Sequence, residues 1–507
     1  MFLPLGEFTP DMPDYNNPGS SLIQNVYPKT AQSYGSITSL STYATALPLR
    51  VQGGIPVIDT GANTFVFAGT ATDLYKIGSG ATTFTNVSQS AGTYSTATNA
   101  QWSMCQFGNQ IIATNYNQNP QVYTLGSSTT FTDLTSAFKA QYVTIVKDFV
   151  MFGNTYDGAG SNQPQQVWWS AINNASSYPT IGSITAAQVQ SDQQVIPGNQ
   201  GWMTGLVGNL GTADVAIFFE RSIWRGTYVG SPNIFAFSAA EGARGTNAPG
   251  SIVQVGAQVY YLGEDGFYAF DGSNSSPIGA NKVDKWFYKN INLNYLHNIS
   301  GAADPVNKII FWAYPSNSST TGQNDSLIIY NWSLNRWSIA SVNSDYIFRA
   351  FTFGYTLEGL DALGYTLDTL PFSLDDRAWT GGKVYLAGFD TNHAFGYFTG
   401  QTLAATVQTS EVELAAQEPN PSVIGRRALV TNARPIVDGG TPTVSIGYRQ
   451  KQQDSIVYST GSTINAYGEC PQRLEARYFR AQITHPAGDV FDHISGVDLT
   501  YVMRGTR

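Results

Sequence analysis

Charged residues are scarce in this chain. They make up 12% of its 507 residues, about half of the usual share. Serine, threonine, asparagine, glutamine and 50 glycines take their place, and uncharged polar residues with many turn formers are typical of short strands joined by tight turns. Hydrophobic residues at 42% and aromatic residues at 13% are ample for a buried core, so wholesale disorder is excluded.

Basic residues form no cluster. The chain has 26 Lys and Arg against 35 Asp and Glu, a net charge of −9. Residues 402–507 hold 10 basic and 10 acidic side chains, which leaves 16 and 25 for residues 1–401, so all of the net negative charge lies there. Tight nucleic-acid binding needs basic groups that neutralise phosphates. An acidic body would instead let DNA pass without gripping it.

Cysteine and histidine are rare. Cys105 and Cys470 lie far apart and outside any metal-binding spacing, so we expect two free thiols in a reducing compartment. His485 and His493 flank a Pro-Ala-Gly turn; we favour surface or strand-end histidines, and a metal pair is the alternative. The start of the chain lacks the features of a signal peptide, and no apolar run approaches the ~20 residues of a membrane helix. We expect no metal site and no membrane span.

The common catalytic motifs are missing. The chain contains no G-x-S-x-G elbow, no P-loop, no G-x-G-x-x-G after a strand and no H-E-x-x-H. The Ser-x-Asp-x-Gly-x-x-Trp boxes of sialidases, which are propeller enzymes, are absent as well. We therefore expect that the protein is not an enzyme and has no catalytic residue and no cofactor. A carboxylate pair for glycoside hydrolysis stays open, because such residues meet in space rather than in sequence.

Three arginines come close together in sequence, namely Arg221, Arg225 and Arg244. They are candidates for binding an acidic sugar, but we favour ion pairs with Glu220 and Glu241 at the edge of a sheet. The 10 tryptophans and 29 tyrosines are candidates for stacking on sugars, although packing between sheets and subunit interfaces use such residues as well.

A loose repeat starts near residue 51. A short apolar strand, a Gly or Asn turn and a second, aromatic-rich strand recur at a spacing of about 40–60 residues and form seven such units. Examples are Val215–Phe219 with Ser222–Arg225, and Val259–Gly263 with Gly266–Gly272. The pattern predicts an all-β fold, a β-propeller with six to seven irregular blades. Stacked β-sandwiches are the competing fold.

The composition divides the chain into three regions. Residues 1–50 contain many prolines, which predict an extended N-terminal arm that lies across its own domain or reaches a neighbour. Residues 51–401 are the propeller-like region with insertions. Residues 402–507 contain strands such as Thr443–Arg449 that alternate apolar with polar residues, which predicts a C-terminal β-sandwich-like domain.

Residues 354–380 interrupt the repeat. Leu-Asp pairs recur there every seventh residue, with their aspartates at Asp361, Asp368 and Asp375. Gly364 and Pro371 argue against one continuous helix. We expect a buried leucine ladder in an irregular connector. A metal site made of the three aspartates is the alternative, but nothing nearby completes an oxygen-ligand loop.

Several further segments, spread over most of the chain, carry a likeness to one family. They are Pro10–Pro13 with Asn25–Pro28, Trp168–Asn173, Glu220–Arg225, Gly230–Phe235, Gly245–Ser251, Gly266–Gly272, Pro277–Gly279, Trp286–Phe287, and Arg434–Gly440 followed by Gly447–Arg449. In this order, and together with the Leu-Asp pairs, they resemble the tail nozzle or tail tubular protein B-like family of short-tailed bacteriophages (podoviruses). None of these segments is catalytic.

The resemblance implies a β-propeller-bearing structural subunit of a homohexameric ring. Such a ring, the tail nozzle, would lie below the head–tail adaptor, contact a tail fibre or tailspike, and continue the channel for DNA ejection. Genomic DNA would pass without sequence recognition. The protein would be made in the host bacterial cytoplasm and reside in the virion tail. The alternatives are a carbohydrate-binding or carbohydrate-cleaving phage receptor-binding β-propeller, and a bacterial surface propeller.

Overall fold

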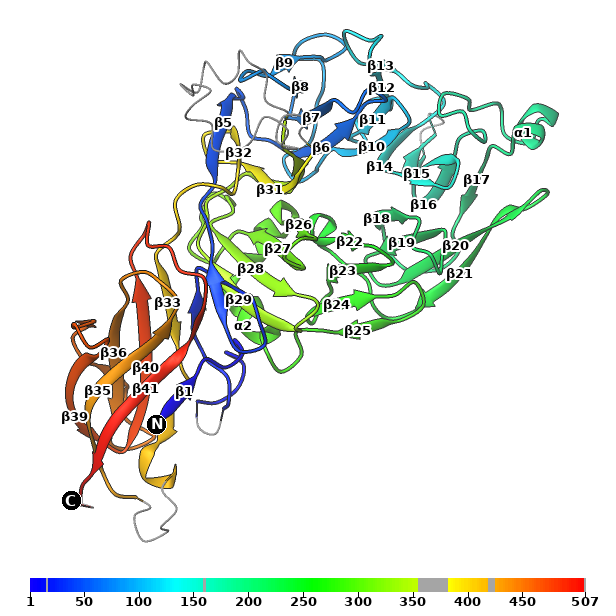
Figure 1. Ribbon diagram of the computed structural model, residues 1–507. Helices are drawn as coiled ribbons and strands as arrows, with labels where there is room; N and C mark the ends of the chain where they lie inside the picture. Colours follow the sequence, from blue (N-terminus) through cyan, green and yellow to red (C-terminus); the bar gives the residue numbers. More distant parts are fainter. Residues whose placement is uncertain (15–16, 158–160, 354–381, 418–424, 506–507) are drawn as a thin grey trace.

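The chain is almost entirely β-structure in the computed structural model, which describes residues 1–14, 17–157, 161–353, 382–417 and 425–505. Figure 1 shows a large body of small sheets and, beside it, a second unit that contains both β1 (Phe2–Pro4) and β41 (Ile494–Met503). The all-β prediction is confirmed. In the part of the chain that is described, no helix is long and apolar enough to cross a membrane.

Small antiparallel sheets of four strands follow one another along the large body. The first two are β6 (Gly53–Ile58), β7 (Thr64–Gly69), β8 (Leu74–Gly78) and β9 (Thr85–Asn86), then β10 (Ser103–Phe107), β11 (Gln110–Thr114), β12 (Gln121–Thr124) and β13 (Thr132–Asp133). The next two are β14 (Lys139–Val146), β15 (Phe149–Tyr156), β16 (Asn162–Trp169) and β17 (Asp192–Val195), then β18 (Met203–Gly208), β19 (Val215–Phe219), β20 (Ile223–Gly230) and β21 (Ile234–Glu241).

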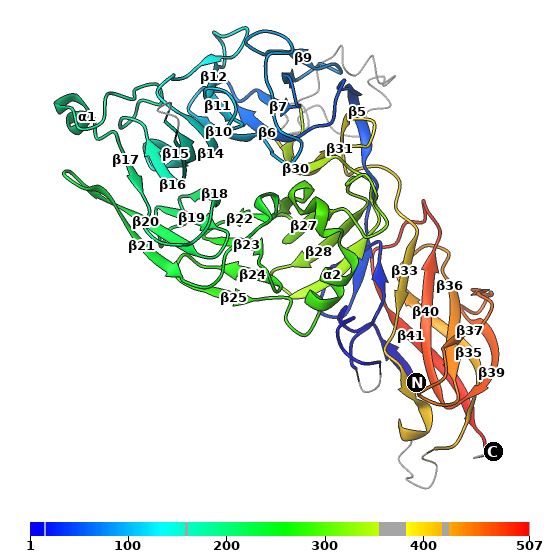
Figure 2. The ribbon, with the colours of Figure 1, turned by 180° about the vertical axis from the view of Figure 1, so that it is seen from behind.

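Two more four-stranded sheets complete the body, together with four strands, β26 to β29, that belong to an 11-stranded sheet continuing through β2 (Ile23–Gln24) into the C-terminal strands. The three groups are β22 (Val253–Val255), β23 (Gln258–Leu262), β24 (Phe267–Phe270) and β25 (Ser275–Pro277), then β26 (Ser300–Asp304), β27 (Ile309–Tyr314), β28 (Ser326–Asn331) and β29 (Arg336–Ala340), and finally β30 (Tyr346–Phe351), β31 (Val384–Phe389), β32 (Ala394–Tyr397) and β5 (Ser41–Ala46). The last group is composite, because β5 comes from the start of the chain and pairs with β32. In Figures 1 and 2 the blue strand β5 lies beside the yellow β32.

The core of the body lies between neighbouring sheets. Phe67 packs toward the second sheet, while its neighbours Val66 and Ala68 pack toward the β30–β31–β32–β5 sheet. Inner strands are therefore covered on both faces, and all residues of β19 are buried. A strand buried on both faces needs apolar residues at successive positions rather than at alternate ones. This explains the short continuous apolar runs in the sequence.

In the described ranges, two short α-helices lie outside the sheets, besides 3-10 turns at Pro249–Ser251, Leu293–Asn298 and Leu414–Gln417. In α1 (Ile184–Val189), Ser183 caps the N-terminus, and its Oγ accepts a hydrogen bond of 3.1 Å from the backbone N–H of Ala186. In α2 (Asp284–Asn290), the cap comes from far along the chain, because the carboxylate of Asp11 accepts hydrogen bonds from the first turn of the helix. The contact ties the N-terminal segment to the large body.

The second unit combines both ends of the described chain. One sheet contains β3 (Val26–Pro28), β4 (Tyr34–Ser36), β41, β35 (Ala428–Val437) and β39 (Cys470–Ala476), with β1 paired to β41. The facing strands are β33 (Ala405–Gln408), β34 (Val412–Glu413), β36 (Thr443–Arg449), β37 (Val457–Tyr458), β38 (Ser462–Thr463) and β40 (Tyr478–His485). Apolar side chains of both sets share one core, which includes Val430, Ile446 and Leu499. We call these strands the C-terminal unit.

The joint between the body and the C-terminal unit is built by the first residues of the chain. The two-residue strand β2 (Ile23–Gln24) pairs with β29 on one side and β33 on the other. Arg336 of β29 is 4% exposed and donates hydrogen bonds to the backbone carbonyls of Leu5, Gly6, Thr30 and Ala31. Its guanidinium also lies 4.7 Å from the centre of the Tyr34 ring. The described residues 1–14 and 17–36 thus lie against the rest of their own chain.

The remaining fold predictions concern the propeller, the domain boundaries, the N-terminal arm, the Leu-Asp segment and the two cysteines. The β-propeller, its six to seven blades, and the boundaries at residues 50 and 401 stay predictions. The predicted arm lies across its own chain, as short paired strands. The Leu-Asp segment with Asp361, Asp368 and Asp375 lies outside the described residues. Cys105 and Cys470 are buried free thiols, and burial raises the pKa of Cys105 to about 12.

Candidate functional site

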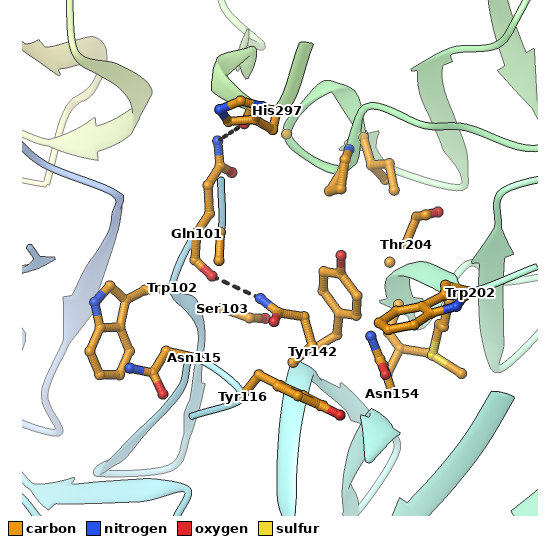
Figure 3. A pocket seen from close by; sticks show the side chains of 18 of the residues that line it. Gln101, Trp102, Ser103, Asn115, Tyr116, Tyr142, Asn154, Trp202, Thr204 and His297 are labelled. Carbon is orange, nitrogen blue, oxygen red and sulfur yellow. Dashed lines mark hydrogen bonds between the residues drawn. The ribbon is translucent and has the colours of Figure 1, made fainter. Parts of the chain in front are cut away.

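A cavity of about 650 Å³ lies where the first strands of several sheets come together. Most of its lining comes from β10, β14, β18, β22, β26 and β30 and from the segments that precede them, and the rest includes Asn115–Asn117 after β11, Asn154 of β15 and Glu220 after β19. Figure 3 shows side chains from these elements around one open space, with Gln101 and Ser103 on one side and Trp202 and Thr204 on the other. The cavity is the meeting point of strands that are far apart in sequence, which makes it the first place to look for a site.

Amide and hydroxyl side chains tie the first strands to one another. Gln141 Nε2 donates to the carbonyl of Gln101 over 3.2 Å, and Gln101 Nε2 in turn donates to the carbonyls of His297 and Ile299, each over 3.1 Å. Ser103 Oγ accepts from the backbone N–H of Val143 at 3.0 Å. These bonds replace the backbone ladder that is missing between separate sheets, and so they fix the cavity wall.

Glycines allow the strands to approach closely at the wall. A Cβ atom on Gly250 would lie 1.9 Å from the carbonyl oxygen of Ile299, and one on Gly208 would lie 1.8 Å from that of Ile145. Real Cβ atoms do not come so near to a backbone oxygen. Gly250 lines the cavity, whose shape therefore depends on glycine there, and Gly208 lets β18 lie close to β14.

Two irregular strand positions face each other on one side of the cavity. The pairing of β15 with β16 shifts register between Gly153 and Thr155, and the pairing of β18 with β19 shifts between Met203 and Gly205. A Cβ on Gly153 would lie 2.1 Å from Met203 Sδ, so the two irregularities lie against each other. β-Bulges commonly redirect a side chain beside a functional site.

The residues at these shifts are Asn154 and Thr204, and both line the cavity. Asn154 has a positive φ of 54°, a left-handed conformation that asparagine adopts more readily than most other residues with a side chain. Asn154 is 5% exposed and Thr204 is 7% exposed. Asn154 Oδ1 and Thr204 Oγ1 have no hydrogen-bond partner in the described structure. Buried polar atoms are nearly always hydrogen-bonded, so two unpartnered oxygens in one wall require an explanation.

Aromatic rings surround these oxygens. Trp202 directly precedes β18 and is 50% exposed, and Figure 3 shows its ring near Asn154, Tyr142 and Thr204. Tyr116 also lines the cavity, and its hydroxyl donates to Asn162 Oδ1 over 2.6 Å. An exposed tryptophan in a cavity wall offers a flat apolar surface to a ligand.

The cavity wall is close to neutral. Glu220 is the only Asp, Glu, Lys or Arg among its described lining residues. Burial lowers the pKa of His297, and the nearby Arg50 cation lowers it further, so this imidazole is uncharged near pH 7. Burial raises the pKa of Tyr142 and raises that of Tyr346 to about 12. Both phenols therefore stay protonated.

Polar uncharged groups dominate the described wall. Glycoside hydrolysis generally uses two carboxyl groups across the scissile bond, and the described wall offers only Glu220. Amides, hydroxyls and aromatic rings together recognise a polar, uncharged molecule of small size.

The three arginines singled out in the sequence occupy two places. Arg221 and Arg244 line a second cavity of about 610 Å³, together with Glu220 and Glu241. Arg244 Nη1 lies 3.9 Å from Glu241 Oε2, which is the ion pair favoured from the sequence. Arg225 is not among its lining residues; its Nε donates to Ser238 Oγ over 3.1 Å on the neighbouring strand. The second cavity has acidic as well as basic groups.

The histidines each have a different environment. His485 Nδ1 lies 2.7 Å from Asp489 Oδ2, whereas His493 Nδ1 lies 2.8 Å from Ser33 Oγ. His393 pairs with the buried Asp345. In the described ranges, no group of three or more His, Cys, Asp or Glu side chains is placed to hold a metal ion.

Sequence reasoning missed Asn154, Thr204 and Trp202. None of them belongs to a motif, and their importance comes from two register shifts that bring β15 and β18 together. One weak signal was present: Gly153-Asn154 combines two residues that tolerate positive φ, inside an otherwise apolar strand, which is a pattern of β-bulges.

Comparisons with known proteins give no family or curated match and only weak structural similarity. No protein-family model matches the chain, and no curated protein does. Among solved structures, the computationally designed Ika8 protein superposes with a TM-score of 0.36 at 8% identity, over 72% of this chain and 99% of that one. PorZ, an essential bacterial surface component of the type-IX secretion system of Porphyromonas gingivalis, gives 0.34 at 9% identity, over 73% of this chain and 42% of PorZ. Structural similarity this weak assigns neither a fold family nor a role to this chain.

Proposed function

We propose that this chain is a structural subunit of the tail of a short-tailed bacteriophage. In this proposal it is a nozzle protein that forms a homohexameric ring, continues the DNA-ejection channel below the head–tail adaptor, and helps to anchor the tail fibres. It acts by assembly and not as an enzyme. The resemblance of segments along most of the chain to this family is the starting point.

The fold part of the proposal is a β-propeller. The groups of four strands in the large body are its blades, and β5 completes the last blade. The packing of first strands supports this reading, because β6 lies against β10, β10 against β14, and β30 against β6 again. Completion of one blade by a strand from the other end of the chain is a way to remove exposed sheet edges.

The observation that carries the assembly proposal is an exposed apolar face on the C-terminal unit. Phe2 and Ile436 flank Gly496 on the outer face of one sheet, where Ile436 pairs with Gly496 and the Phe2 ring covers it. Phe2 is 49% exposed and Ile436 is 40% exposed. Val502 is 52% exposed but lies six residues farther along β41, beyond Thr500 and beyond Asp498, which pairs with Arg434. The apolar pair beside Gly496 is therefore the candidate interaction surface.

In this proposal DNA passes through the central hole that the subunits of the ring enclose, and not through a cavity within one chain. Double-stranded DNA is on the order of 20 Å across, since grooves about 8 Å deep lie on both sides of the base pairs. The cavity of about 650 Å³ is large enough only for a small molecule. The channel is thus formed by the ring, and the acidic balance of residues 1–401 keeps DNA from adhering to it.

The test is the oligomeric state of the purified protein, alone and mixed with tail components. We expect sixfold rings with a central hole by negative-stain imaging and a hexameric mass by light scattering. Ile436→Glu places a charge in the proposed interface and should weaken assembly at least about tenfold per contact. Val306→Glu is the matched control, because Val306 is 70% exposed and lies in the large body. A protein that stays monomeric or trimeric with every component, and binds or cleaves bacterial polysaccharide, would overturn the proposal.

A further inference from the structure

We infer that the cavity at the first strands is a binding site for a neutral saccharide, held between the register shifts of β15 and β18. Asn154 and Thr204 would bind its hydroxyl groups, and Trp202 would stack on one face of the sugar ring. This role goes beyond assembly into a tail, and it does not depend on the oligomeric state.

The first argument is the pair of unpartnered oxygens. Asn154 Oδ1 and Thr204 Oγ1 are each in a residue more than nine-tenths buried, and both residues line the cavity. Both oxygens have almost no accessible surface, so a ligand in the cavity meets them after the Asn154 and Thr204 side chains turn toward it, and the hydrogen bonds gained by two unsatisfied polar atoms favour that turn. Both atoms arise at a register shift, and Asn154 in addition has a positive φ. The backbone is thus distorted at both positions that present these oxygens.

The second argument is the chemistry of the wall, which selects the ligand class. Asn154 Oδ1 only accepts hydrogen bonds, and Thr204 Oγ1 both donates and accepts. A ligand with several hydroxyl groups matches both. No Lys or Arg is among the described lining residues, so a phosphate or carboxylate ligand would find no counter-charge. Glu220 is an additional acceptor for a hydroxyl.

The third argument is Trp202. Half of its surface is exposed although it stands beside a buried wall. A sugar ring has an apolar C–H face besides its hydroxyl groups, and an indole ring offers a flat partner for that face. The volume of about 650 Å³ lies within the usual range for small-molecule sites and suits a short oligosaccharide.

The experiment is saturation-transfer NMR followed by calorimetric titration of the full chain. The probes are glucose, galactose, mannose and N-acetylglucosamine, with maltose, lactose and chitobiose as longer probes. We expect saturable binding of at least one of them. Trp202→Ala and Thr204→Val should each weaken that binding about tenfold, the latter with little change of shape. Tyr467→Ala is the matched control, because Tyr467 is 83% exposed on the C-terminal unit and should leave affinity unchanged.

The outcomes separate the possibilities. Saturable binding that both cavity variants weaken, and the control does not, supports the inference. Absence of binding for all seven probes overturns it, and bound water then satisfies the two oxygens. Binding that is equal in Thr204→Val, Trp202→Ala and the parent chain also overturns it, since the sugar then binds elsewhere. Should Trp202→Ala fail to fold, as judged by circular dichroism, Thr204→Val decides alone.

Discussion

The surroundings of Asp284 disfavour the ionised form of its carboxyl group. Asp284 is 7% exposed, and its carboxylate accepts a hydrogen bond of 3.1 Å from the backbone N–H of Phe267. Burial raises the pKa of Asp284 to about 6, the N–H of Phe267 opposes this, and the charges of Asp11 and Asp265 add to it. We therefore predict that Asp284→Asn stabilises the protein at neutral pH.

The sign and size follow from the two protonation equilibria. The folded protein holds the Asp284 proton up to a pKa of about 6, whereas the model value is 3.8. The stability that this proton contributes is fully present below pH ~4 and is lost as the pH rises through about 6. The difference corresponds to on the order of 2–3 kcal/mol. Asparagine does not titrate, so the variant should gain this much relative to the parent between pH 4 and pH 7.

The assay is denaturant unfolding of the parent protein and of Asp284→Asn at several pH values from 4 to 7.5. The quantity compared is the difference between their free energies of unfolding at each pH. Asp73→Asn is the matched control, because Asp73 is also buried but has the opposite environment. Burial raises its pKa, yet hydrogen bonds from Gly92, Thr72, Asn86 and Ser88 outweigh this and lower it. This variant should be less stable at pH 7 by about 1–3 kcal/mol, with the gap closing in acid. A pH-independent difference for Asp284→Asn would refute the reasoning.

Two further predictions concern the fold. Gly250→Ala should destabilise the protein by about 2 kcal/mol or more, because the new Cβ would lie 1.9 Å from the carbonyl oxygen of Ile299. Gly242→Ala is the control and should be nearly neutral in the same unfolding assay, because no atom lies within 4 Å of its new Cβ. Arg336→Met should cost about 3 kcal/mol, since the carbonyl oxygens of Leu5, Thr30 and Ala31 lose this donor, and the bond to Leu5 is fully buried. Limited proteolysis should then cut within residues 1–36 faster than in the parent chain, and equal rates would contradict the assigned joint.

The inner strands were predictable from sequence, and the first strands were not. Val215–Phe219 and Ile309–Tyr314 are continuous apolar runs because sheets cover both of their faces, and such runs are visible without a structure. β18 reads Met-Thr-Gly-Leu-Val-Gly, since one side of it faces a polar cavity and its glycines admit neighbouring strands. Small and polar residues give little hydrophobic periodicity, so the strands that line the cavity have the weakest signal.

The long-range pairings escaped prediction for a related reason. β5 belongs to the predicted N-terminal arm, yet it pairs with β32, some 350 residues later. Likewise β2 is only two residues long, and its place between β29 and β33 follows from the packing of the whole chain. Local patterns contain no information about such partners. The cavity residues Asn154 and Thr204 depend on packing of the same kind, between strands of different sheets.

The two proposals concern surfaces that can be changed independently. The exposed apolar pair Phe2 and Ile436 belongs to the C-terminal unit, whereas Asn154 and Thr204 belong to sheets in the middle of the large body. Effects of substitutions at distant sites without shared partners are expected to add. The joint at Arg336 holds the two parts together through buried hydrogen bonds, so a substitution in one part leaves the other in place. A ring that assembles without sugar binding, or a sugar-binding chain that never assembles, would therefore each assign one role and remove the other.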